Sequence, residues 1–195
     1  MNLGRTVAKG TRSGGILFKA GEEELMTDVM TRMIEAQAHA TAVEDILNEL
    51  AETFKQQIGY RLCSLSVFEG GRDLTARRIW TSHPVEYPVN GTKSKPDPEW
   101  VAQVIDRQKP FLCRDKADVQ RVLFDYETIF QLGCGSVLNL PVRLFGSVIG
   151  TVNLLHDEHW FTPERVERAE SLVALVYAPM LLVRWPKFMS EGDAL

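Results

Sequence analysis

Two asparagines in this 195-residue chain, Asn139 and Asn153, are the side chains best suited to hold a small ligand. Both interrupt apolar runs that are typical of β-strands, where asparagine is disfavoured. A half-buried amide needs hydrogen-bond partners, because an unsatisfied buried amide costs free energy. A small polar ligand could supply those partners. The two amides could also bond to each other, to the backbone or to water, and the sequence leaves both alternatives open.

The asparagines belong to a predicted hairpin, and the register of that hairpin decides which way they face. If Phe145–Ser147 form a three-residue loop with the glycine in the left-handed conformation, Asn139 lies opposite Asn153. Arg143 and Thr151 then lie nearby on the same polar face. The pairs on the opposite, wholly apolar face are Leu138–Leu154, Leu140–Val152 and Leu144–Val148. Because this register separates a polar face from an apolar one, we predict the three-residue loop.

Aromatic side chains could wall a pocket around the asparagines, since ligand pockets are mostly apolar with a few polar groups. The candidates at the pocket mouth are Trp80, Tyr87, Trp100 and Tyr126. Each of them could instead be ordinary core filling. With the asparagines and Thr151 they make up the predicted ligand-binding set. Two lysines of the same region, Lys93 and Lys95, could receive an acidic ligand or simply be solvated. We expect Asp115 and Asp125 to be helix caps or ion-pair partners.

The three cysteines are widely spaced and form no Cys-x-x-Cys pair, so the sequence predicts no metal site and a reduced, cytoplasmic setting. Cys63 lies on the apolar face of a predicted strand and is expected to be inert. Cys113 and Cys134 are the candidate redox pair, but thiol chemistry needs an exposed thiolate of low pKa. The other interpretation makes them small hydrophobic residues. We expect His156 and His159 to lie in a solvated loop.

Composition narrows the class of protein further. Apolar residues make up 45% of the chain and charged residues 25%, as in ordinary globular proteins. The net charge of −4 argues against nucleic acid as a partner. The longest apolar run, Leu172–Val183, is too short to cross a bilayer and is interrupted by Pro179, so we expect no membrane partner.

The elements that must position these residues begin with two helical stretches. Apolar residues recur at helical spacing in residues 25–34 and again within a second helical stretch, residues 41–58, which Gly59 ends. These are one long helix or two helices with a bend near residues 39–41. A hairpin follows, with strands in residues 61–69 and 74–82 around a Gly70-Gly71 turn.

The middle of the chain alternates loops, helices and a strand. Residues 83–98 are rich in proline and predict an irregular loop, which ends where Asp97 caps a helix with Pro98 in its first position. Residues 110–113 predict a short strand, and residues 115–132 one or two helices. Thr162 and Pro163 begin the last helix, which Pro179 must kink or end.

This order predicts an α+β fold with a central antiparallel sheet of about six strands. The terminal helices would pack on one face, and loops and short helices would cover the other. We expect a flexible arm in residues 1–24, an N-terminal helix in 25–40 that makes a dimer contact, one domain in 41–185 and a flexible tail in 186–195.

The chain resembles the GAF domain family, whose fold is similar to that of PAS domains. The motif that carries the resemblance is Gly133, Ser136–Val142, Gly146, Val148–Leu154 and Phe161–Glu164. Residues 110–115 are similar to the strand and turn that this family places before its central helices, and the resemblance covers residues 41–182. It implies a pair of terminal helices on one sheet face, often used for dimerisation. It also implies a ligand pocket on the other face, roofed by the loops between the second and fourth strands.

The resemblance implies a sensory or regulatory domain for signal transduction that binds a small polar molecule and forms a homodimer through its terminal helices. It names no ligand or cofactor, because GAF domains serve many roles. One alternative is an interaction module without a ligand. Another is a thiol enzyme similar to free methionine-R-sulfoxide reductase, a member of the family. The chain departs from that enzyme's pattern, since Val137 and Leu155 stand where it has acidic pocket residues. We therefore do not expect an enzyme.

Overall fold

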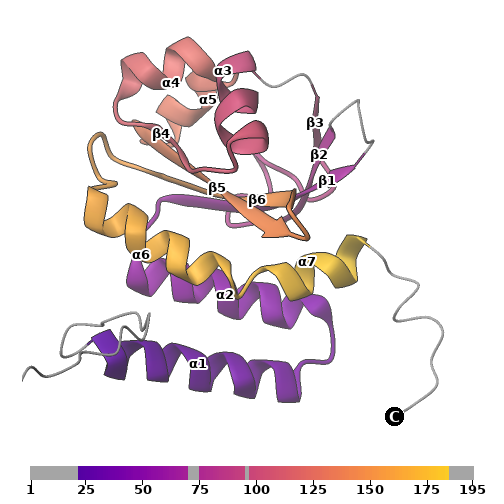
Figure 1. Ribbon diagram of the computed structural model, residues 1–195. Coiled ribbons are helices and arrows are strands. Elements are labelled where there is room, and N and C mark those ends of the chain that lie inside the picture. Colours follow the sequence, from indigo (N-terminus) through magenta and orange to yellow (C-terminus); the bar gives the residue numbers. More distant parts are fainter. Residues whose placement is uncertain (1–21, 70–74, 95–96, 185–195) are drawn as a thin grey trace, which may run out of the picture.

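A six-stranded antiparallel sheet, in the order β3-β2-β1-β6-β5-β4, forms the middle layer of the computed structural model (Figure 1). Its strands are β1 Leu62–Glu69, β2 Thr75–Thr81, β3 Thr92–Ser94, β4 Phe111–Cys113, β5 Ser136–Leu144 and β6 Ser147–His156. The predicted α+β class and sheet are confirmed. The three-residue β3 lies where the sequence predicted only a loop, because it lacks the apolar alternation of a half-buried strand.

The structure describes residues 22–69, 75–94 and 97–184. Several predictions lie outside the described residues: most of the N-terminal arm (1–21), the Gly70-Gly71 turn, Lys95 and the tail from residue 186.

Four helices form the layers below the sheet (Figure 1). They are α1 Glu22–His39, α2 Val43–Gln57, α6 Pro163–Val173 and α7 Tyr177–Arg184. Helices α6 and α7 pack against the sheet, α2 packs against both of them and bonds to β2 through Asn48, and α1 packs on the outer side of α2. The two helical stretches at the N-terminal end are thus separate helices, α1 and α2. Asp45 Oδ2 accepts hydrogen bonds from the backbone N–H groups of Thr41 (2.9 Å) and Ala42 (3.0 Å), which caps α2.

Short helices cover the upper face of the sheet. They are α3 Pro98–Val101, the π-helical turn η1 Ala102–Asp106 that continues it, α4 Lys116–Val122 and α5 Tyr126–Gln131. The predicted caps are confirmed, because the side chains of Asp97 and Asp115 accept hydrogen bonds from backbone N–H groups in α3 and α4. Thr162 caps α6 in the same way.

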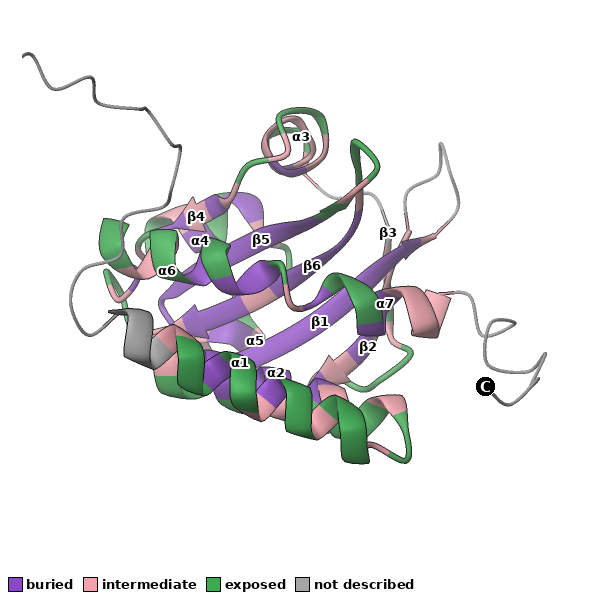
Figure 2. Ribbon diagram, turned by 60° about the horizontal axis from the view of Figure 1, so that its bottom comes forward, coloured by how far each residue is buried: buried purple, intermediate pink, exposed green. Residues whose placement is uncertain are grey.

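The sheet separates two hydrophobic cores, and its central strands are buried on both sides (Figure 2). The lower core holds Phe54 of α2, Leu65 of β1, Leu140 of β5 and Leu172 of α6, among others. The upper core is smaller and holds Phe68, Trp100, Val119 and Ile129, among others. Except at two bulges, side chains therefore alternate along the strands between a lower, fully packed layer and an upper layer that also carries polar groups.

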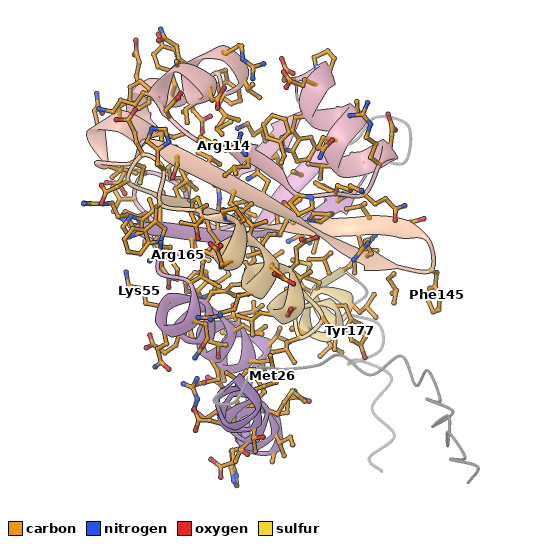
Figure 3. All side chains as sticks on the ribbon, turned by 60° about the vertical axis from the view of Figure 1, so that its left-hand side comes forward. Met26, Lys55, Arg114, Phe145, Arg165 and Tyr177 are labelled. Carbon is orange, nitrogen blue, oxygen red and sulfur yellow. The ribbon has the colours of Figure 1, made fainter. Side chains whose placement is uncertain are left out.

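The β5–β6 hairpin keeps the predicted register in its interior but not at its tip. Leu144 pairs with Ser147, so the loop is the two residues Phe145 and Gly146, with φ of 50° and 73°. Both angles fit the primed turn that two-residue hairpin loops favour. A bulge at Ile149 then takes up one residue and restores the predicted pair Asn139–Asn153. The prediction of a three-residue loop is therefore wrong. Phe145 is exposed at the tip, beyond the sheet (Figure 3).

Beside this bulge, helix α7 approaches the sheet very closely. As predicted, the helix around Pro179 is interrupted: α6 ends at Val173, and Pro179 lies in the first turn of α7. Met180 of α7 is fully buried against Gly150 of β6. A Cβ atom added at Gly150 would lie 2.2 Å from the carbonyl oxygen of Ser66 and 2.9 Å from Met180 Sδ.

We expect Gly150→Ala to lower the free energy of unfolding by about 2–3 kcal/mol, since the backbone of β1 must shift to admit the methyl group. Urea denaturation monitored by circular dichroism measures this. Gly146→Ala is the matched control: its added Cβ meets nothing within 4 Å. Only its left-handed φ penalises alanine there, by about 1 kcal/mol. Equal losses in the two variants would contradict the close approach at Gly150.

Candidate functional site

A cavity of about 320 Å³ lies between the upper face of the sheet and the short helices. Its floor comes from β1, β2, β5 and β6. Its walls and roof come from residues 87–93, Asp97, Trp100 of α3 and the α4–α5 region at residues 122–129. The cavity is therefore on the face, and under the part of the chain, where the family resemblance implied a pocket.

Strand pairing arranges the floor of the cavity in four rows of side chains that run across the strands. In order, the rows are Leu62–Leu155–Val137, Ser64–Asn153–Asn139, Arg78–Ser66–Thr151 and Lys93–Ala76–Phe68. We call the second the amide row and the third the arginine row. The apolar members of the first and fourth rows flank these two polar rows, so a bound molecule would meet polar groups at the centre of the floor.

The amide row is bonded within itself. Asn139 Nδ2 donates to Asn153 Oδ1 at 2.8 Å, and Asn153 Nδ2 donates to the backbone carbonyl and the hydroxyl oxygen of Ser64, both at 3.3 Å. Trp100 Nε1 donates to Asn139 Oδ1 at 2.9 Å from the roof. The asparagines thus bond to each other, as one of the two sequence-based interpretations proposed. The hydrogen bond between Trp100 and Asn139 also links α3 to the sheet.

The arginine row has far fewer internal partners. The side chains of Ser66 and Thr151 are buried, and no hydrogen bond joins their hydroxyls to another described residue. Arg78 Nη1 donates to the carbonyl of Pro88 at 3.0 Å, and the guanidinium lies over the ring of Tyr87. Its Nε is buried without a hydrogen-bond partner among the described residues. Burial lowers the pKa of the Arg78 guanidinium, because desolvation penalises its charge.

An ion-pair cluster closes one side of the cavity. Asp125 Oδ1 accepts from Lys93 Nζ at 3.1 Å, and its Oδ2 accepts from the Tyr87 hydroxyl at 3.2 Å. Lys93 Nζ also lies 4.4 Å from the ring centroid of Phe124. Burial, followed by the Asp125 charge, raises the pKa of Tyr87 above its usual value. The prediction that Asp125 is an ion-pair partner is confirmed, and Lys93 is occupied by it.

The predicted aromatic residues divide between the two faces. Tyr87 and Trp100 line the cavity, as Thr151 does, but Trp80 and Tyr126 do not. Trp80 turns to the helical side and donates from Nε1 to Asn48 of α2 at 2.8 Å. The cause is a bulge at Ile79: Ser66 pairs with Arg78 but Leu65 pairs with Trp80, which breaks the alternation.

Tyr126 packs against Phe130 within α5, with ring centroids 5.7 Å apart.

Sequence reasoning missed Arg78 and Ser66 as parts of the site. The available signal was simple alternation, since Arg78 shares a strand face with Ala76 and Ser66 shares one with Ser64. A charged residue in the middle of a predicted strand, on its polar face, indicates a position that can contact a ligand.

The cysteines and histidines take no part in the cavity lining. All three cysteines are buried and free, and burial raises the pKa of Cys113 to about 12 and of Cys134 to about 11. Both thiols are therefore protonated near neutral pH, whereas redox chemistry would need a thiolate. His156 stacks on Trp160 with centroids 3.7 Å apart. Within residues 22–69, 75–94 and 97–184, no group of three or more His, Cys, Asp or Glu could hold a metal.

These features define a class of protein: an α+β domain with one antiparallel sheet, terminal helices on one face and a roofed cavity on the other. Residues 40–177 match the family model described as GAF domain. The chain belongs to the GAF domain family. No curated protein sequence matches it. Among the helices that the structure describes, none is long and apolar enough to cross a membrane.

Solved structures show the same fold. The chain is similar to the GAF domain of an Acinetobacter phosphoenolpyruvate-protein phosphotransferase, with a TM-score of 0.61, 11% identity and coverage of 88% of this chain and 98% of that one. For the corresponding domain from Coxiella burnetii the values are 0.59, 13%, 87% and 98%. For the GAF domain of a Bacillus halodurans two-component sensor histidine kinase they are 0.58, 14%, 76% and 99%.

We expect Asn139→Ala to lower the free energy of unfolding by about 2 kcal/mol, because it leaves Trp100 Nε1 and Asn153 Oδ1 buried without partners. Chemical denaturation measures the loss. Asn48→Ala is the matched control, since it removes the same kind of Trp–Asn bond, from Trp80, at an exposed site. The control should cost less than about 1 kcal/mol. A cost as small for Asn139→Ala would mean that the amide row does not fasten the roof.

Proposed function

We propose that this chain is a sensory or regulatory GAF domain that binds a small polar molecule in the cavity. The observation that carries the proposal is the cavity itself, which is of ligand-binding size and has on its floor the unpartnered Nε of Arg78 beside the Ser66 and Thr151 hydroxyls, which bond to no other described residue. Apolar residues surround those groups, as in most small-molecule sites. The structural neighbours are GAF domains of a sensor kinase and of phosphotransferases, which supports a regulatory role.

The two other candidate functions have less support. A module without a ligand would be favoured by a cavity filled by Trp80, Tyr126 or Phe130, and none of these lines it. A thiol enzyme would need an accessible, ionised cysteine, and burial raises the pKa of Cys63, Cys113 and Cys134. Ligand binding without catalysis is the function that the geometry supports best.

We expect Ala76→Phe to abolish ligand retention, because the ring would fill the cavity floor between Phe68 and Lys93. The measurement is native mass spectrometry of the purified protein for a retained metabolite, followed by thermal shift with that metabolite. Ala117→Phe is the matched control, since Ala117 is exposed on α4 and outside the cavity lining. Equal retention by the two variants would place the ligand elsewhere and contradict the proposal.

We also propose that the domain forms a homodimer through its terminal helices. Helix α1 buries Val29 and Met33 against the rest of the domain, yet its outer side is exposed (Figure 2). That side carries Met30 and Ile34, which are 42% and 62% exposed and lie one turn apart. Tyr177 of α7 is also exposed. An apolar stripe on an outer helix is well suited to a second copy of the same helix, which would present the same stripe.

We expect Ile34→Glu to shift the protein from dimer to monomer, because a two-fold contact would bring two carboxylates into an apolar interface. Size-exclusion chromatography with light scattering measures the mass. Val85→Glu serves as the control, since Val85 is an exposed apolar residue of the loop after β2. A wild-type chain that stays monomeric at every concentration would refute the dimer, and a dimer that survives Ile34→Glu would refute this interface.

A further inference from the structure

We infer that the ligand is a small organic monocarboxylic acid, held by its carboxylate on the arginine row of Arg78, Ser66 and Thr151. The inference rests on the proposed function and adds the chemical class of the ligand and the groups that recognise it. The amide row, which the sequence made the leading candidate, plays a supporting part.

The charge of Arg78 favours an anionic ligand. Among the described residues Arg78 forms no ion pair: the nearby carboxylate of Asp125, whose charge favours the Arg78 cation, bonds to Lys93 and Tyr87 instead. A partly desolvated cation without an anionic partner is unfavourable. The Nε–Nη2 edge of a guanidinium matches the two oxygens of a carboxylate, and Arg78 has its Nε buried and unpartnered.

The hydroxyls next to Arg78 can donate to a carboxylate bound there. Cross-strand pairing sets Ser66 beside both Arg78 and Thr151 on the cavity face. Ser66 is 7% exposed and Thr151 is 2% exposed, and each hydroxyl has a donor to offer. A carboxylate on Arg78 would let both hydroxyls point their hydrogens at its oxygens. This satisfies three polar groups at once, whereas the amide row is satisfied already.

The rest of the lining limits the ligand to one negative charge and an apolar body. Lys93 is neutralised by Asp125, so Arg78 is the cation left for a ligand among the described lining residues. The carboxylate of Asp97 also lines the cavity and would repel a second negative group. Beyond the two polar rows, the ion-pair cluster and Asp97, the lining is mostly apolar, from residues that include Phe68, Ile129 and Leu155. A phosphorylated ligand is disfavoured on the same grounds.

The test compares acids with their isosteric amides. Isovalerate, isocaproate, phenylacetate and indole-3-acetate, each beside its primary amide, would be titrated into the full-length protein and followed by ¹H–¹⁵N correlation spectra. We expect at least one acid to bind about tenfold more tightly than its amide. Arg78→Gln should remove that preference. Arg77→Gln should keep it, since Arg77 bonds to Glu69 outside the cavity lining.

A second variant guards against misfolding of Arg78→Gln, which also loses the bond to Pro88. Ser66→Ala combined with Thr151→Val removes the two hydroxyls with little change in volume and should weaken the acid several-fold. A panel in which no acid outperforms its amide overturns the inference, as does a retained metabolite that is neutral or cationic. In the latter case the proposed function still stands, provided that Ala76→Phe expels that metabolite. A ligand that Ala76→Phe leaves in place would overturn the proposed function itself.

Discussion

The pairing of β1 with β6 at the centre of the sheet is the contact on which the rest of the structure depends. It joins segments that are far apart in the chain, from Leu62 opposite Leu155 to Val67 opposite Gly150. Closing so long a loop costs entropy. The cost is offset by what the pair buries: Leu65 and Val67 enter the lower core, and the same strand turns Ser64 and Ser66 to the cavity.

One strand therefore supplies fully buried hydrophobic residues to the lower core and two serines to the polar floor. A slip of one residue would bury serines among the helices and place leucine and valine under the cavity. The close approach of Gly150 to the Ser66 carbonyl adds a steric constraint, since Met180 of α7 packs onto the same point. The helical layer and the cavity floor thus meet at the same few residues.

Much of this architecture follows from the sequence, because it depends on periodicity and on capping residues. Helix spacing, the Asp97, Asp115 and Thr162 caps and the interior pairing of Asn139 with Asn153 are local properties, and all three agree with the structure. The differences are bulges. A single extra residue at Ile79 or Ile149 reverses the faces beyond it, and no residue type marks such a site reliably. For that reason the sequence places Trp80 on the wrong side of the sheet and predicts a hairpin loop that is one residue longer than the observed one.

The identity of the polar floor residues could be predicted from alternation, but their state of satisfaction could not. Whether a buried amide or hydroxyl has a partner depends on groups from other elements, such as Trp100 reaching down to Asn139. The two polar rows are neighbours on one sheet face, but they differ in charge and in how many of their polar groups have partners. One row uses its hydrogen bonds to join the sheet to α3, which makes the wall of the cavity rigid. In the other row, Arg78 Nε and the hydroxyls of Ser66 and Thr151 bond to no other described residue, which is why we propose it as the ligand site. A ligand on that row would touch the sheet, the Tyr87–Lys93 segment and the α4–α5 region together. Occupancy would then stabilise the roof in proportion to ligand concentration, and this coupling between binding and local stability is the physical basis for a sensor.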